Sequence, residues 1–429
     1  MSISAAFATT YVDKWLNIPR LSRFVEERCQ EYYSDMNSFV SPYTSIVQAS
    51  GSGKSRLLRE YANYTPCIYL CLGSGQCFPR PSEIVRDELI IETSESDRKL
   101  GERKMNDVLV RLLAAAFTKA ADVNWDPIKF IECQAVGLDS KSPDNQIEAK
   151  FKNDIKLSPA VALKRIIDAA PKSAKYPTMV LILDEARGLL NEKSETVSAF
   201  RIFRRAWADL AQALKGKGIQ IFALLTDTTS RVANFSPSTN QDSSLRFLSN
   251  TIIEPGPTRL LKPYFMVTNM DIFVQSGYPR TSDEAFAIEN IVRRGRPIWY
   301  VTLASASDSE NGINTAFKLA RRKVSCGANL TDMKGNLYVI SMAALGMRVV
   351  LDVHSYGALA ETLSSASMRC ITSISESRDA VLTEYPSDPI LSHAASMITS
   401  QYQTLRPSET LRNLFTINKL SSAQSDQCW

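Results

Sequence analysis

The sequence has few residues that could build a metal centre or a disulfide framework. Only two histidines occur in 429 residues, and none of the eight cysteines forms a C-x-x-C pair. Structural zinc sites and disulfide scaffolds depend on closely or regularly spaced ligands of these two types. We therefore expect neither kind of site, and we expect a reducing, intracellular location in the cytoplasm or the nucleus.

Excess charge and long hydrophobic runs are also scarce. Fifty Lys and Arg against 45 Asp and Glu leave a net charge of +5, which is too small over this length to indicate a nucleic-acid partner by itself. The apolar run at 337–353 is interrupted by Arg348 and is short for a membrane span, so it predicts a buried helix. The N-terminal residues lack the basic start and apolar core of a secretory signal. We expect no membrane segment and no secretory leader.

One stretch carries a recognisable pattern, residues 44–58 with the sequence TSIVQASGSGKSRLL. Residues 45–48 predict the end of a buried strand, residues 49–53 a loop of small residues, and Lys54 the start of a helix. Successive backbone N–H groups can hold a polyphosphate only where the side chains are too small to block them. The order strand, small-residue loop, helix is therefore typical of a phosphate-binding loop.

The pattern G-x-x-x-x-G-K-[ST] assigns a role to each residue of this loop. Lys54 would reach the β- and γ-phosphates, and the hydroxyl of Ser55 would bind Mg²⁺. Gln48 stands where the pattern has its first glycine, so the match is incomplete, and an ordinary glycine turn before a helix is the alternative. The predicted nucleotide-binding residues are Ser50, Gly51, Ser52, Gly53, Lys54, Ser55 and Arg56.

A second buried strand ends in two carboxylates. The apolar run at 179–183 is typical of a central parallel strand, and Asp184 and Glu185 follow it directly. In doubly wound folds this position lies beside the phosphate loop, where Asp184 could hold Mg²⁺ through its water shell and Glu185 could polarise a water for attack. An exposed acidic pair that starts a helix is the alternative reading.

A third strong strand is predicted at 219–225 and is followed by Thr226. In P-loop ATPases with an extra strand between the two phosphate-site strands, a polar residue at this position senses the γ-phosphate. We take Thr226 as the candidate. A threonine at a strand end is also ordinary turn chemistry.

The remaining pattern predicts a helical C-terminal third. We expect an α/β fold, a P-loop NTPase with a parallel sheet flanked by helices, followed by an all-helical lid or bundle. The predicted domains are a helical N-terminal preface at 1–43, the α/β domain at 44–282 and the helical domain at 283–429. Helical patterns occur at 314–323, 337–353, 358–374 and 389–401, and the polar stretch 139–153 predicts an exposed loop.

The triplet Gly295-Arg296-Pro297 opens the helical third. It is similar to the G-x-P motif by which signalling P-loop ATPases place a helix N-terminus over the nucleotide. Arg296 would then contact phosphate when the two halves close. A proline-started helix with a basic cap is the alternative.

Five stretches together resemble one family: QASGSGKSRLL, VLILDEARGLL, FALLTDTTSRVANFSP, GRPIWYVTLA and EYPSDPILSHAA. They look like the P-loop ATPase module of fungal and oomycete Crinkler-type proteins, which are related to the signalling (STAND) branch of AAA+-like ATPases. The resemblance covers residues 20–400 and implies binding of ATP with Mg²⁺. In this family the module often precedes a restriction-endonuclease-like domain. We expect the present sequence to contain neither such a domain nor an L-F-L-A-K-like header.

The expected activity is ATP hydrolysis that drives or gates a movement of the helical lid. Glu185, Thr226 and Arg296 are the predicted catalytic residues, Ser55 and Asp184 the predicted Mg²⁺ ligands, and ATP and ADP the expected partners. Two alternatives remain: a nucleotide-gated switch with little hydrolysis, and the ATPase part of a Crinkler-type effector without its nuclease domain. A second copy of the chain or another protein as partner is left open, and a nucleic-acid motor has only scattered arginine clusters in its favour.

Overall fold

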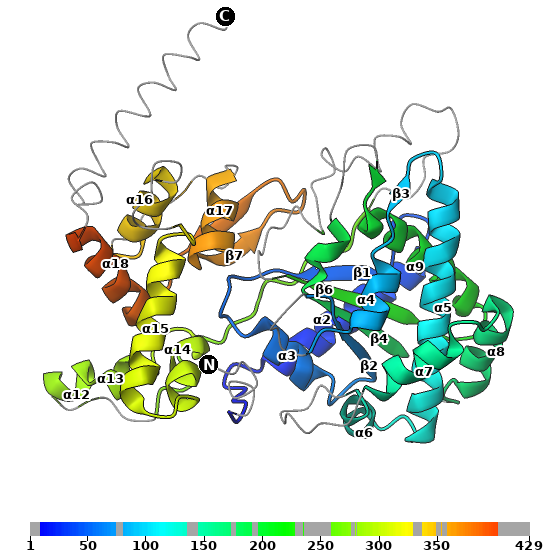
Figure 1. Cartoon of the computed structure of the whole chain (residues 1–429), viewed down its shortest axis with the longest axis horizontal. Helices are drawn as coiled ribbons and strands as arrows, with labels where there is room; N and C mark the ends of the chain where they lie inside the picture. The colour runs from blue at the N-terminus through cyan, green and yellow to red at the C-terminus, as the bar shows by residue number, and fades with distance from the viewer. Residues whose placement is uncertain are drawn as a thin grey trace, which may run out of the picture.

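The computed structural model describes residues 9–73, 80–134, 145–172, 177–190, 196–227, 235, 259–275, 279, 281–328, 337–348, 353 and 358–401. Figure 1 shows two parts, a sheet covered by helices and a mostly helical part at the other end of the molecule. Each part has its own hydrophobic core, one built around the sheet and one around the C-terminal helices.

The sheet has four parallel strands in the order β1-β6-β4-β2. They are β1 (Tyr43–Ile46), β2 (Cys67–Cys71), β4 (Met179–Asp184) and β6 (Ile221–Thr226). Every residue in them is buried, as expected for a parallel sheet with both faces covered. The strands predicted from the apolar runs are confirmed.

Strand β6 lies between β1 and β4, so the strand that carries Thr226 separates the loop strand from the strand that carries Asp184. A further segment continues the sheet beyond β1. Tyr264 donates its N–H to the carbonyl of Ser45 and its carbonyl accepts from the N–H of Val47, both at 2.8 Å.

Because the four strands are parallel, their carboxyl ends meet at one edge of the sheet.

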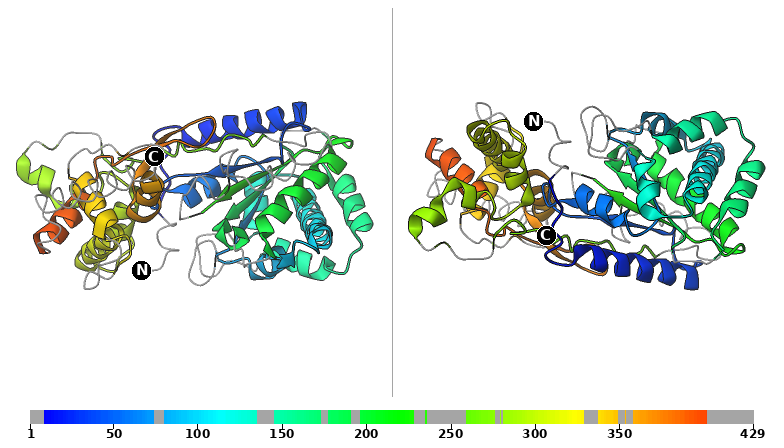
Figure 2. Two further views of the ribbon diagram at one scale, coloured as in Figure 1. Left: turned by 90° about the horizontal axis from the view of Figure 1, so that it is seen from above. Right: turned by 90° about the horizontal axis from the view of Figure 1, so that it is seen from below.

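Helices cover both faces of this sheet, and Figure 2 shows α2 on one face and α5 across from it. The hydroxyl of Tyr33 on α2 donates to the carbonyl of Ile221 on β6 at 3.1 Å. The long helix α5 packs against α7, α8 and α9. The helical elements of this part are α2 (Asn17–Ser34), α3 (Lys54–Tyr61), α4 (Glu83–Leu89), α5 (Arg98–Asp122), α6 (Pro127–Glu132), α7 (Gln146–Asp154), α8 (Pro159–Ala169), η1 (Ala186–Leu190) and α9 (Ala199–Lys215), with the short pair β3 (Thr93–Ser94) and β5 (Thr196–Val197).

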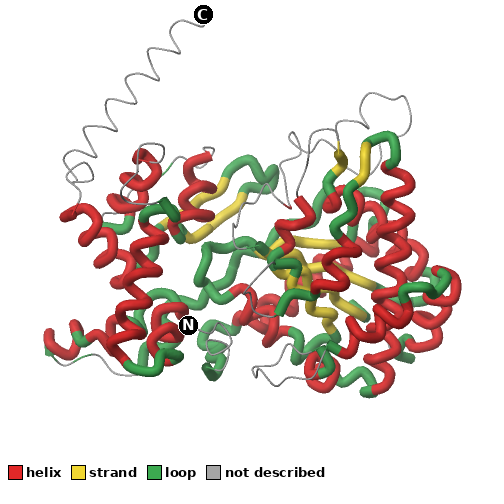
Figure 3. The backbone as a smooth tube through the Cα atoms, in the orientation of Figure 1, coloured by secondary structure: helices red, strands yellow, loops and turns green. Residues whose placement is uncertain are grey.

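The C-terminal part is mostly helical, as expected, but it also contains an antiparallel hairpin, visible in Figure 3 as the yellow pair among the helices of this part. Its helices are α12 (Ser282–Phe286), α13 (Ile288–Ile291), α14 (Pro297–Ala304), α15 (Ser309–Val324), α16 (Leu337–Gly346), α17 (Ala358–Ser367) and α18 (Pro389–Gln401), and its strands are β7 (Cys370–Ile374) and β8 (Val381–Glu384).

Two predictions of local structure are wrong. The C-terminal third of the chain is not all-helical, because the helix expected at 358–374 ends at Ser367 and strand β7 follows. In β8, Val381 and Thr383 are buried while Leu382 and Glu384 are exposed, which is the alternation of a half-buried strand. The loop expected at 139–153 contains helix α7 instead, because Asn145 caps it by accepting from the N–H groups of residues 147 and 148. Residues 135–144 lie outside the described part.

The apolar run at 337–353 forms a helix over only its first part. Helix α16 ends at Gly346 and contributes buried residues to the C-terminal core, whereas the described residues 347, 348 and 353 are not helical. Among the helices that the structure describes, none combines the length and the hydropathy required to cross a bilayer.

Candidate functional site

The predicted strand, loop and helix are present, and the loop at 48–53 has the backbone that its glycines allow. Strand β1 ends at Ile46 and α3 begins at Lys54. Gly51 and Gly53 have φ values of +75° and +89°, a region that side-chain-bearing residues rarely adopt. Gly53 is the N-cap of α3 and has no side chain with which to cap the helix. The first N–H groups of α3 therefore open toward the 48–53 loop.

Lys54 is buried at this helix start. Its Nζ donates to the carbonyls of Gln48 at 2.5 Å and Ala49 at 3.4 Å. Burial lowers the pKa of Lys54 to about 8, although the negative charges of Asp184, Asp227 and, more weakly, Glu185 oppose this shift. The structure thus holds a partly desolvated ammonium group among carboxylates.

Asp184 lies at the end of β4, buried beside the loop. Its Oδ2 accepts from the hydroxyl of Tyr69 on β2 at 2.7 Å, and its carboxylate also accepts from the side chain of Ser55. Burial raises its pKa, while these hydrogen bonds and the charge of Lys54 act in the opposite direction. The two predicted Mg²⁺ ligands, Ser55 and Asp184, are therefore in direct contact.

Glu185 has an unusual backbone for its residue type. Its φ is +52°, and its N–H donates to Oδ1 of Asp184 at 2.9 Å. A non-glycine residue in this region costs about 1–3 kcal/mol and persists only where the surroundings impose it. The strained turn places Glu185 at the same edge of the sheet as Asp184, half-buried and close enough to Lys54 to influence its pKa.

Strand β6 contributes two buried polar residues at the same edge. The hydroxyl of Thr226 donates to the carbonyl of Ile46 at 3.2 Å, which joins the ends of β6 and β1 next to the 48–53 loop. Asp227 follows it and is also buried. Asp227 was missed in the sequence, although its position after an apolar run is the same signal that identified Asp184.

Arg296 is fully buried where the two parts of the molecule meet. Gly295 has a φ of +78°, and α14 begins at Pro297, as the triplet predicts. The guanidinium of Arg296 donates to Oδ2 of Asp388 at 2.8 Å and to the carbonyl of Met368. The structure brings Arg296 against the loop, since its Cδ lies 3.5 Å from the point that a Cβ on Gly51 would occupy. Its guanidinium is engaged by Asp388.

Three further residues of the site have roles that the sequence did not reveal. Gln48, which the sequence showed only as a departure from the loop pattern, ties the loop to β7 through its side chain. Asn269 donates to the carbonyl of Ser52 at 2.8 Å and accepts from Asn17 on α2 at 3.0 Å. Tyr69 stands inside an apolar run and is readable there only as a core residue. Each partner is distant in the sequence, so no local pattern could reveal it.

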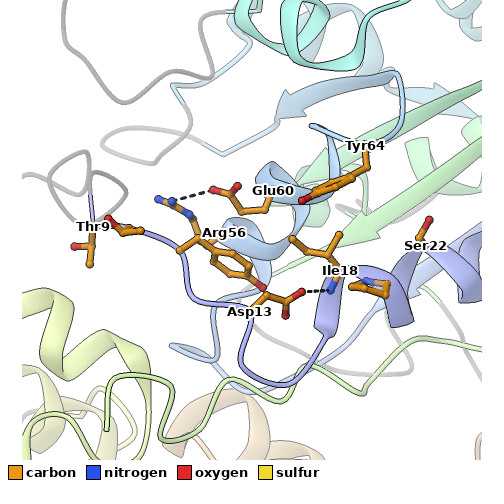
Figure 4. Close-up of a pocket in the computed structure, with 10 residues that line it drawn as sticks. Thr9, Asp13, Ile18, Ser22, Arg56, Glu60 and Tyr64 are labelled. Carbon is orange, nitrogen blue, oxygen red and sulfur yellow. Dashed lines mark hydrogen bonds and ion pairs between the residues drawn. The ribbon is translucent and has the colours of Figure 1, made fainter. Parts of the chain in front are cut away.

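A cavity of about 680 Å³ lies between the N-terminal segment, α2 and α3, and Arg56, the residue after Ser55, lines it (Figure 4). Arg56 lies over the ring of Tyr11 at 5.8 Å and forms an ion pair with Glu60 at 2.9 Å. The other residues that line this cavity are Thr9, Thr10, Asp13, Ile18, Pro19, Ser22 and Tyr64. Aromatic, aliphatic and charged groups all face it.

The site can be tested for its fit to the expected Mg²⁺. In the described residues no group of three or more His, Cys, Asp or Glu side chains is arranged to hold a metal by itself. A nucleotide-bound Mg²⁺ needs fewer protein ligands, because phosphate and water oxygens complete its shell. The adjacent oxygens of Ser55 and Asp184 fit this sparse kind of site.

The comparisons with known proteins give a family but no function. A family model described as "Domain of unknown function (DUF8735)" matches residues 13–267, from the start of the N-terminal helical segment to the segment that extends the sheet beyond β1. No curated protein and no solved structure matches the chain. Because the family model covers more than half of the sequence, the chain belongs to the DUF8735 family.

Proposed function

We propose that this protein is a P-loop NTPase that binds Mg-ATP and hydrolyses it. The observation that carries the proposal is Lys54, a buried ammonium at a helix N-terminus that opens onto a glycine loop, with Asp184, Glu185 and Asp227 around it. A buried cation at a helix N-terminus is suited to an anion of high charge. Oxygens of a triphosphate would replace the carbonyls that Lys54 now contacts.

A second feature of the loop supports a phosphate ligand. The hydroxyl of Ser52 is buried and has no hydrogen-bond partner among the described residues. A buried hydroxyl without a partner costs free energy, because its contacts with water are lost and nothing replaces them. A phosphate oxygen at the 48–53 loop would supply that partner.

The strand order supports the same class of protein. The polar end of β6 lies between the strand before the loop and the strand that ends in Asp184. This is the order expected for P-loop ATPases with an extra central strand, in which the residue at its end faces the γ-phosphate. Thr226 occupies this position.

The residues of the site divide into binding and chemical roles. Ser55 and Asp184 would hold Mg²⁺, which supplies neutralisation of phosphate charge when bound. Glu185 would orient a water molecule and accept its proton, and its strained backbone holds the carboxylate at the strand edge. Lys54 would pair with the phosphates as a fixed charge.

The cavity beside Arg56 would take the base and ribose of the nucleotide. Arg56, which lines the cavity, follows Ser55 on α3, and a nucleotide whose phosphates lie at the loop would have to reach the cavity along this helix. Tyr11 offers a ring for stacking, and Glu60 and Asp13 offer acceptor oxygens. Aromatic and carboxylate groups of this kind suit a purine with an exocyclic amine.

The function is tested by titrating the full chain with Mg-ATP in a calorimeter. Lys54→Ala should abolish tight binding, because it removes the fixed positive charge on the β/γ-phosphates. Lys129→Ala, which alters an exposed lysine on α6, is the control and should bind like the parent. If Lys54→Ala binds as tightly as the parent, the loop is not a phosphate site.

The cavity is tested by comparing ATP with inorganic tripolyphosphate, which has the phosphates but no base. Tyr11→Ala should weaken ATP binding and leave tripolyphosphate binding unchanged. Tyr11→Phe keeps the ring and should bind both ligands normally, since the buried Tyr11 hydroxyl has no partner among the described residues. An equal loss of both ligands in Tyr11→Ala would show that the cavity is not the base site.

A nucleotide-gated switch is the second candidate function. It is favoured by the way the C-terminal part packs on the loop. A Cβ on Gly51 would meet Met368 at 2.9 Å and Ile298 at 3.0 Å. Two nucleotide states that differ at the loop would then favour different placements of this part. ATP-dependent and ADP-dependent protease patterns that differ in a protein without measurable turnover would favour the switch.

The resemblance to Crinkler-type ATPase modules leads to a proposal about what ATP hydrolysis would serve. An ATPase of this kind would act together with nucleic acid in the context of an effector. Turnover measured with and without added DNA or RNA tests the idea. A rate that neither nucleic acid changes would count against it.

A further inference from the structure

Gln48 uses its whole side-chain amide for hydrogen bonds at the start of the 48–53 loop. Its Nε2 donates to the carbonyls of Phe265 at 2.9 Å and Ile371 at 3.0 Å. Its Oε1 accepts from the N–H groups of Ile371 and Ala49, both at 2.9 Å. An amide has two donor hydrogens and two acceptor lone pairs, so its capacity is filled. One side chain thus pairs both backbone groups of Ile371, as a neighbouring strand would.

This link joins two parts of the chain that fold on different cores. Ile371 belongs to β7, whose partner strand is β8. Around the amide, Val47 packs with Ile371 and Val381 in a small hydrophobic cluster. The contact between the loop strand and the C-terminal hairpin is therefore both polar and apolar.

The same C-terminal segment touches the loop a second time. Met368, three residues before Ile371, lies against Gly51, where an added Cβ would be 2.9 Å from its Cε. The carbonyl of Met368 also accepts from Arg296. A shift of the 48–53 loop therefore moves the segment 368–371 at two points.

Gln48 also connects to Lys54 through its backbone. Its carbonyl accepts from Nζ of Lys54 at 2.5 Å. A phosphate at the loop would draw the ammonium away from this carbonyl, so the backbone of residue 48 would lose a charged donor. Phosphate binding would therefore first affect the backbone of Gln48, the residue whose side chain is hydrogen-bonded to β7.

We propose that Gln48 is a positioning residue that couples nucleotide occupancy of the 48–53 loop to the C-terminal hairpin. The inference rests on the proposed nucleotide site. The glycine that usually stands at this position would leave the loop free, whereas Gln48 holds it in the form in which Lys54 contacts its own loop. When phosphate binds at the loop, the hydrogen bonds between Gln48 and Ile371 are released and β7 is held less tightly. The stability of the hairpin therefore depends on whether the loop holds a nucleotide.

The test measures two quantities on the full chain: the affinity for Mg-ATP, and the hydrogen-exchange rates of amides 370–384 with and without nucleotide. In the parent, Mg-ATP should accelerate hairpin exchange by a factor within the usual range of allosteric coupling, about 5–150-fold. In Gln48→Gly, the hairpin amides should exchange fast both with and without nucleotide. This variant should also bind Mg-ATP at least about fivefold more tightly than the parent, which is the low end of that range.

Arg378→Met is the matched control. Arg378 lies in the hairpin turn and donates to the carbonyl of Leu260, so it ties the hairpin to the α/β part at a point outside the 48–53 loop. This variant should speed hairpin exchange but keep the response to nucleotide and the parental affinity. If it behaves like Gln48→Gly, coupling belongs to docking as a whole and the role of Gln48 is overturned.

Gln48→Glu covers the case in which Gln48→Gly fails to fold. It keeps the size and the acceptor oxygens but places a carboxylate oxygen against the carbonyls of Phe265 and Ile371. It should give the same loss of nucleotide response. A normal response in this variant overturns the inference, whereas ATP binding by Lys54→Ala would overturn the nucleotide site itself, so the two failures are distinguishable.

Discussion

The two hydrophobic cores of the molecule are built from different side chains. The core around the sheet is filled by large aliphatic and aromatic residues such as Leu181, Ile182 and Trp207. The C-terminal core has a larger share of alanine, with Ala394 and Ala395 among the six alanines of its sixteen buried residues. Small side chains bury less apolar area per residue, so the second core gains less from the hydrophobic effect.

The two parts also differ in where their buried charged residues lie. In the described α/β part, three of the five buried charged residues (Lys54, Asp184 and Asp227) lie at the candidate site, and the other two, Asp154 and Arg204, lie on α7 and α9. In the C-terminal part, Arg296 and Asp388 form a buried ion pair, and Trp299 also donates to Asp388 at 2.9 Å. A buried pair is costly to break from one side, because the remaining charge has no partner. The C-terminal part thus contains a buried ion pair whose carboxylate is shared with Trp299, whereas most buried charges of the α/β part lie at the candidate site.

The largest effect is expected from Asp388→Ala, which leaves Arg296 buried without its carboxylate. Loss of one partner of a buried pair costs about 3–5 kcal/mol, and the loss should fall on the C-terminal part while the sheet stays folded. Hydrogen exchange resolved along the chain in increasing urea measures both parts separately.

The control for this variant is Glu102→Ala, which removes a half-buried partner of Arg205 in the α/β part. It should cost less than about 1 kcal/mol, as partly exposed pairs do. Equal losses in the two variants, or joint unfolding of both parts, would contradict the contrast between the two cores.

Turnover should depend on the α/β part. Glu185→Gln should keep its affinity for Mg-ATP and lose about two orders of magnitude or more in rate, because a general base is removed. Single-turnover phosphate release measures the chemical step, and Glu83→Gln on α4 serves as the control. An unchanged rate in Glu185→Gln would move the protein to the switch class.

Nucleotide affinity should fall at alkaline pH. The pKa of Lys54 is about 8 in the free protein because of burial, and bound phosphate would raise it, so binding needs the protonated form. Affinity is full below pH 8 and should fall by about tenfold per pH unit well above it. Calorimetry from pH 7 to 9.5 tests this; Lys54→Arg, which stays charged, should show no such decline, and a parental profile as flat as this control would contradict the assignment.

The smallest effect is expected for the free energy of unfolding when one of two glycines with similar backbone conformations is replaced by alanine. Gly51 and Gly218 have φ values of +75° and +72°, but an added Cβ meets Met368 and Ile298 at Gly51 and nothing within 4 Å at Gly218. Gly218→Ala should cost about 1–2 kcal/mol from backbone strain alone. Gly51→Ala should cost more, because it also pushes the C-terminal part away. Urea midpoints measure both, and equal costs would show that the contact across the two parts is loose.

The sequence by itself determined the parts that local pattern encodes. Runs such as residues 179–183 are apolar throughout, because a parallel strand covered on both faces has no exposed side. Glycines before Lys54 and the proline at 297 likewise marked where α3 and α14 begin, since these residues restrict or free the backbone at fixed positions. The sheet, the loop and most helices could therefore be predicted.

The tertiary structure alone decided which distant groups meet. Tyr69 and Asp184 are 115 residues apart, Arg296 and Asp388 are 92 apart, and Gln48 and Ile371 are 323 apart, yet each pair is hydrogen-bonded. The hairpin β7–β8 was missed for a related reason: its short strands gain their stability by packing on Val47 and Phe265 rather than from their own sequence. Such contacts depend on which surfaces are brought together when the chain folds, and no periodicity along the chain records that choice.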